Sequence, residues 1–173
     1  MHGVNKEESL DSTLFESIQM RLPWLIVNLA TAFFASFVIK MFEGTIEQIV
    51  ALSATMTIVT GMGGNAGSQT LSIMIRNIAL GEIHFKDCWP ALKKEICVGF
   101  INGLMTGIIT GIIVYGLYGN VYLGIIICIA MIGNLIISGI FGFLIPVALK
   151  AMHLDPALAS SIFLTTATDI LGF

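Results

Sequence analysis

The fold of this chain is decided by one charge-free stretch, residues 96–149, which reads ICVGFINGLMTGIITGIIVYGLYGNVYLGIIICIAMIGNLIISGIFGFLIPVAL. A helix needs about 20 predominantly apolar residues to cross the hydrocarbon core of a bilayer, so this stretch is long enough to cross it twice. The glycine and asparagine residues within 116–120 are turn formers and divide it into two helices. The stretch therefore predicts a transmembrane helical hairpin.

The overall composition is also that of a membrane protein. Hydrophobic residues make up 56% of the chain and charged residues 11%, with a mean hydropathy of +0.93. Soluble proteins carry roughly a quarter charged residues. The net charge of -3 and the lack of a basic cluster exclude nucleic acid as a partner. The 3 cysteines have no spacing typical of metal or redox sites. We expect a multi-pass protein of the cell membrane, with the lipid bilayer as its surroundings.

Three further stretches flank the hairpin. Residues 22–41 form the first predicted span, and residues 48–75 form a second span that is interrupted. The last predicted span covers residues 156–173 and opens with Pro156, a favoured residue of the first helical turn. We therefore expect an all-α membrane protein with five transmembrane helices.

The basic residues predict how these helices are oriented. With five spans, all of the 8 basic residues except Lys40 fall on the N-terminal side of the membrane. Lys and Arg are enriched in cytoplasmic loops, which puts the N-terminus inside and the C-terminus outside. Residues 1–20 then form a cytosolic lead-in segment, and residues 21–173 form a five-helix transmembrane pore domain.

Small residues indicate which helix faces pack together. Glycine recurs at every fourth residue from Gly99 to Gly111, and the next helix carries Asn134, Ser138 and Gly142 at the same spacing. Small residues let backbones approach closely in a membrane, where no hydrophobic effect draws helices together. We interpret both faces as packing surfaces. Asn134 is the exception, because an amide in mid-membrane needs a partner.

The sequence LTTATDILGF, residues 164–173, carries the candidate site, with Asp169 as the only charge of the last predicted span. A carboxylate at membrane depth costs a few kcal/mol or more unless it faces a polar cavity or a cation. Ser161 and Thr165 share its helix face, and Gly172 lies beside them. This polar stripe predicts a cation site. The alternative is an acid that lies in the headgroup region and has no role.

The second span contains Gly61-Met-Gly-Gly-Asn-Ala-Gly-Ser-Gln-Thr70. These residues match the loose dinucleotide pattern G-x-G-x-x-A, but the apolar flanks lack the strand that this site requires. Gly63 and Gly67 would also permit a close helix crossing. Polar side chains such as Asn65 are costly at this depth unless they meet water or an ion. We expect a break in the helix that lines the same path as Asp169.

Three motifs of the chain resemble the MgtE-type magnesium channel and transporter family, which is related to the eukaryotic solute-carrier magnesium transporters. They are the glycine-rich segment 61–70, Arg21-Leu-Pro-Trp-Leu25, and Asp155-Pro-Ala157 together with Thr165-Thr-Ala-Thr-Asp-Ile-Leu-Gly172. The resemblance covers nearly all of residues 21–173. It does not extend to the family's cytosolic helical domain and pair of CBS modules. It implies a homodimer in which the second and fifth helices line a pore on the two-fold axis, with Asp169 as the central magnesium-binding group.

The candidate site suits magnesium. Mg²⁺ prefers octahedral oxygen coordination and keeps several of its waters, and two Asp169 carboxylates in a homodimer match its charge. No thiolate or histidine lies on the stripe, which argues against zinc or copper. The predicted metal-binding residues are Asp169, Asn65, Gly64, Thr165 and Thr166. The predicted pore-lining residues are Gly61, Gly63, Ser68, Ser161 and Gly172.

The predicted function is transport of Mg²⁺, as the transported ion, through a pore at the homodimer axis. Some relatives are thought to exchange sodium for magnesium, so a passive channel and a Na⁺- or H⁺-coupled exchanger both remain open, with Mn²⁺ and Na⁺ as further candidate ions. A membrane-embedded enzyme is disfavoured because no histidine or lysine accompanies Asp169 in its span. A purely structural assembly subunit would not explain Asp169.

Overall fold

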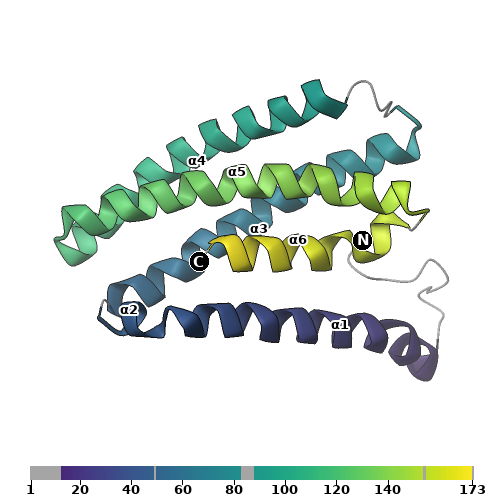
Figure 1. Ribbon diagram of the computed structural model, residues 1–173, viewed down its shortest axis with the longest axis horizontal. Coiled ribbons are helices and arrows are strands. Elements are labelled where there is room, and N and C mark those ends of the chain that lie inside the picture. Colours follow the sequence, from purple (N-terminus) through teal and green to yellow (C-terminus); the bar gives the residue numbers. More distant parts are fainter. Residues whose placement is uncertain (1–12, 49, 83–87, 154, 173) are drawn as a thin grey trace.

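The computed structural model describes residues 13–48, 50–82, 88–153 and 155–172. This part of the chain forms six α-helices and is drawn in Figure 1. The helices are α1 (Leu14–Met41), α2 (Glu43–Gln48), α3 (Val50–Ala79), α4 (Cys88–Tyr118), α5 (Val121–Ala151) and α6 (Pro156–Gly172).

The five longer helices run in alternating directions, and the short α2 lies at the turn between α1 and α3 (Figure 1). Arg76 in the last turn of α3 and Lys150 in the last turn of α5 therefore lie at the same end of the molecule. Lys40, in the last turn of α1, lies at the other end. This arrangement suits the predicted orientation, but the side that faces the cytoplasm remains a prediction.

Three helices of the described chain, α1, α4 and α5, are long and apolar enough to cross a membrane. The predicted count of five spans is therefore not confirmed beyond these three helices. α3 is equally long but carries the polar segment 61–70, and α6 has 17 residues, a length of about 26 Å. α1 begins at Leu14, behind a capping box of Thr13 and Glu16, and so includes part of the predicted lead-in segment. α6 begins at Pro156 as predicted.

The interruption predicted within residues 61–70 was wrong, because α3 is helical without a break from Val50 to Ala79. Its glycines serve close packing instead. Gly63 and Gly67 are buried; a β-carbon would meet the side chain of Asn134 at Gly63 and that of Leu164 at Gly67. A helical backbone pairs its own polar groups, so a continuous helix costs less in a membrane than an open turn.

Helix α5 forms the centre of the bundle and packs against α3, α4 and α6. Five of the six buried apolar side chains of the core cluster come from α4 and α5, and Val59 comes from α3. Within the described residues, α1 contacts α6 and α2 alone, and Ala35 is its one buried side chain. The core thus lies around α5, and α1 lies at the periphery, next to α6.

The glycine face of α4 packs directly on the backbone of α5, which confirms the sequence interpretation. An added β-carbon would lie 2.6 Å from the Leu135 carbonyl oxygen at Gly99 and 2.7 Å from the Ile132 Cα at Gly103. Gly111 and Gly124 face each other in the same way, at 2.8 and 2.7 Å from the partner's carbonyl oxygen. Close contact of two backbones is what small residues provide in a membrane.

The turn predicted at 116–120 is also present. α4 ends at Tyr118, Gly119 takes a φ of +66° that disfavours other residues, and Asn120 caps α5. The Asn120 Oδ1 accepts hydrogen bonds from the backbone N–H groups of Tyr122 at 3.0 Å and Leu123 at 3.2 Å. These N–H groups have no partner within the helix, so the cap satisfies them.

We expect Gly103→Ala to destabilise the bundle by about 1–3 kcal/mol, the usual cost of overpacking. The added methyl group would meet the backbone of α5, which cannot move aside as a flexible side chain can. Gly116→Ala is the matched control on the same helix, because nothing lies within 4 Å of its β-carbon position. Thermal unfolding in detergent measures both variants, and equal melting temperatures would contradict the packing interpretation.

Candidate functional site

The predicted stripe lies on one flank of α6. Ser161, Thr165 and Asp169 are all partly exposed. The neighbouring face of the same helix is closed, with Leu164 and Thr168 each at 0% exposure. Asp169 therefore lies at the edge of the buried face, and the chain leaves one side of its carboxylate open.

The threonine hydroxyls of this flank are turned back onto their own helix. Thr165 Oγ1 donates to the carbonyl oxygens of Ser161 at 3.0 Å and Ile162 at 3.1 Å, and Thr166 Oγ1 donates to Ile162 at 2.7 Å. A hydroxyl has one hydrogen and two acceptor lone pairs. With that hydrogen used, each oxygen can only accept from other groups. The flank is thus a hydrogen-bond acceptor surface, suited to a cation or to its bound water.

On α3, the polar residues divide between two sides of the helix. Gly63 and Gly67 face α5 and α6. Asn65 and Gln69 each follow one of these glycines by two residues, which is about 200° around the helix. Both amide side chains are exposed. Ser68 is partly buried between the two sides. The exposed amides therefore point away from the chain's own core. Lipid tails cannot hydrogen-bond with them.

Thr70, at the end of the glycine-rich segment, is 7% exposed and donates a hydrogen bond of 2.8 Å to Glu95 Oε2 of α4. Glu95 was not among the predicted site residues. Its position directly before the charge-free stretch was the available signal, but the sequence separation of 25 positions hid the pairing. This bond satisfies one of the polar groups for which an interruption had been predicted.

The predicted site residues therefore fall into separate groups. Ser161, Thr165 and Asp169 share one flank of α6, and Thr166 is partly exposed nearby on that helix. Gly61 and Gly64 have nothing within 4 Å of an added β-carbon. Gly63 and Gly172 instead both contact the side chain of Asn134. The metal-binding and pore-lining roles of all these residues remain predictions.

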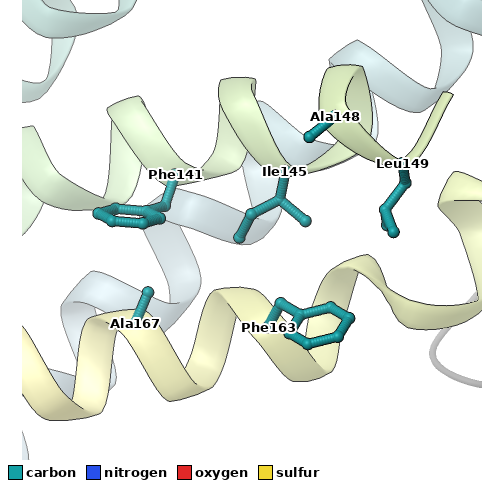
Figure 2. A pocket seen from close by; sticks show the side chains of 6 residues that line it. All are labelled: Phe141, Ile145, Ala148, Leu149, Phe163 and Ala167. Atoms are coloured by element: carbon teal, nitrogen blue, oxygen red, sulfur yellow. The ribbon is translucent and has the colours of Figure 1, made fainter. Parts of the chain in front are cut away.

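Among the cavities that the described residues line, two lie beside α6 and are lined mainly by apolar side chains. Figure 2 shows the first, between α5 and α6, with a volume of about 310 Å³. It is lined by Phe141, Ile145, Ala148, Leu149, Phe163 and Ala167. The second, about 190 Å³, is lined by apolar side chains of α1, α2, α3 and α5, by Phe42 between α1 and α2, by Thr45 and by Gly172.

Neither cavity contains the Asp169 side chain. Ala167, in the wall of the first, lies about 200° around α6 from Asp169. Among the described residues, no three His, Cys, Asp or Glu side chains are grouped as metal ligands. One described chain therefore offers a single carboxylate on an open flank, rather than a complete cage for a divalent ion.

Comparison with known proteins identifies the family. Residues 56–173 match the family model MgtE, described as a divalent cation transporter. The chain belongs to the MgtE family. It is thus a membrane protein of a transporter family, and the prediction that it is not an enzyme is confirmed.

Curated relatives agree along most of the chain. The magnesium transporter MgtE of Bacillus subtilis is 32% identical over 96% of this chain and 37% of its own length. The magnesium transporter MgtE of Enterococcus faecalis is 30% identical over 97% of this chain and 37% of its own length. That of Thermus thermophilus is 27% identical over 88% of this chain and 34% of its own length. The chain thus spans little more than a third of the length of these relatives.

The open space at Gly64 generates a prediction. We expect Gly64→Leu to leave expression and melting temperature unchanged, because nothing lies within 4 Å of an added β-carbon. We also expect it to lower divalent cation flux into liposomes by at least about tenfold, which corresponds to an added barrier of about 1.4 kcal/mol. A leucine at the exposed Ala54 of the same helix is the control. Normal flux in Gly64→Leu would show that this position faces lipid.

Proposed function

We propose that the chain forms the membrane pathway of a divalent cation transporter, in which hydrated Mg²⁺ passes between two copies of the chain. The observation that carries this proposal is the acceptor flank of α6. Asp169 is partly exposed beside Thr165, whose hydroxyl hydrogen is already bonded to its own helix. Family membership and the printed function of the curated relatives support magnesium as the ion.

Magnesium would cross as a hydrated ion. Mg²⁺ demands near-ideal octahedral geometry and gives up its water reluctantly, so proteins commonly hold it by one or two carboxylates and several waters. Those waters donate outward from the ion. Threonine oxygens that can only accept would form the outer shell around them, and Asn65 and the glycine-rich segment of α3 would line the same path.

A second copy supplies what one chain lacks. One carboxylate matches half of a divalent charge, and two Asp169 side chains across a two-fold axis would match all of it. The exposed Asn65 and Gln69 of α3 favour the same arrangement, because a facing protein surface or water-filled path would satisfy amides that lipid cannot. Without the cation the two carboxylates would repel each other, so protons and Na⁺ are expected competitors.

The central test is Asp169→Asn, which keeps the size of the side chain and removes its charge. We expect Mg²⁺ flux into proteoliposomes and Mg²⁺ binding by calorimetry to fall by at least about a hundredfold, because loss of both charges of a dimer costs the ion several kcal/mol. Glu82→Gln removes an exposed charge outside the spans and serves as control. Unchanged binding in Asp169→Asn would falsify the site. Runs with and without a Na⁺ or pH gradient separate a passive channel from a coupled exchanger.

The two-fold arrangement has its own test. In a chain whose 3 cysteines are replaced, we expect Gln69→Cys to crosslink two copies through a short thiol reagent. Gln69 is exposed on α3, and in the proposed dimer this face would meet its counterpart. Phe100→Cys, on an exposed position of α4, is the control for random collision and should remain uncrosslinked. A chain that transports Mg²⁺ as a monomer, or crosslinks equally at both positions, would contradict the dimer.

A further inference from the structure

Asn134 lies in the middle of α5, where α3 and α6 meet it. Its side chain is 1% exposed. The Asn134 Nδ2 donates a hydrogen bond of 2.7 Å to the Val59 carbonyl oxygen of α3. A carbonyl oxygen can only accept, so this bond fixes the orientation of the amide, with the nitrogen toward Val59.

The amide fits between two glycines of different helices. A β-carbon on Gly63 of α3 would lie 2.3 Å from the Asn134 Nδ2, and one on Gly172 of α6 would lie 2.9 Å from the same atom. A side chain larger than hydrogen at either position would therefore displace the Asn134 amide from its bond to Val59 or push α3 or α6 away from α5. Gly172 follows Asp169 by three residues on one rigid helix, so the contact also fixes the depth and rotation of Asp169.

The Asn134 Oδ1 has no hydrogen-bond partner among the described residues. A buried acceptor without a partner destabilises the fold, whereas an apolar side chain of similar size would fill the same space without that cost. The hydrogen bond to Val59 adds a direct link between helices, which an apolar side chain would not provide. Packing alone thus does not account for an amide at this position.

We propose that Asn134 is a positioning residue for cation transport. Its amide bonds to Val59 of α3 and packs against Gly172, at the end of α6 that carries Asp169, and so sets the distance between the two helices that line the path. This role rests on the proposed function, because it matters only if Asp169 holds the ion. A path width set in this way discriminates the small, strongly hydrated Mg²⁺ from the larger Ca²⁺.

The first test is Asn134→Leu in the full chain, reconstituted in liposomes. The leucine fills the space, removes the unpaired acceptor and removes the bond to Val59. We expect an unchanged or higher melting temperature, Mg²⁺ flux lowered at least about tenfold, and a lower ratio of Mg²⁺ to Ca²⁺ flux. A residue that only packs would move the melting temperature rather than this ratio. Parent-like flux and selectivity in Asn134→Leu would overturn the proposal.

A second variant keeps the test decisive if Asn134→Leu does not fold. Gly63→Ala places a methyl group against the amide, whereas Gly133→Ala, next to Asn134 in α5, meets nothing within 4 Å. We expect Gly63→Ala to lower the Mg²⁺ to Ca²⁺ ratio and Gly133→Ala to leave it unchanged. Residues that act through one contact are not additive, so combining Gly63→Ala with Asn134→Leu should add little. Equal ratios in the two alanine variants, or full additivity, would overturn the proposal.

Asp169→Asn, measured in the same liposomes, separates the two proposals. If Asp169→Asn abolishes flux while the Asn134 and Gly63 variants behave as the parent, the positioning role is wrong and the proposed function stands. If Asp169→Asn transports as the parent, the proposed function fails and the positioning role fails with it, whatever the Asn134 variants show.

Discussion

The close backbone contact around α5 is the constraint on which the rest of this structure depends. In lipid no hydrophobic effect draws apolar helices together, so their association relies on packing and on hydrogen bonds between helices. Gly103 brings α4 against the backbone of Ile132. Gly142 of α5 similarly meets the carbonyl oxygen of Gly67, 2.8 Å from an added β-carbon. These contacts place α3 and α4 against α5. Gly172 against Asn134 adds α6 and thereby positions the flank that carries Asp169.

The polar groups of the spans divide according to whether this packing satisfies them. Thr70 bonds to Glu95 and Asn134 bonds to Val59, so both contribute to the internal structure. Asn65 remains exposed, and Asp169 remains partly exposed on α6. A hydrogen-bonded group inside the bundle stabilises one arrangement of helices, whereas a polar group on an open face in a membrane requires water, an ion or another chain.

Much of this arrangement could be predicted from the sequence, because it depends on local spacing. The four-residue recurrence from Gly99 to Gly111 indicated a packing face without knowledge of the partner, and the residues around Gly119 indicated the turn. The continuity of α3 could not be predicted in the same way. Whether Gly63 ends a helix or packs against another one depends on Asn134, and the nearby bond from Asn134 to Val59 joins residues 75 positions apart. The sequence revealed the polar segment but not the side chains that cover it.

The flank of α6 that carries Asp169 is a part of the bundle that the chain itself leaves open. Asp169 and Thr165 lie beside the buried face of α6 rather than within it, and the apolar cavity between α5 and α6 lies on the other flank (Figure 2). The helix thus presents an apolar flank on one side and an acceptor flank on the other. An apolar flank is compatible with lipid, but an acceptor flank with a carboxylate is not. What covers that flank must supply positive charge or water, and in the proposed dimer a hydrated divalent cation would supply both.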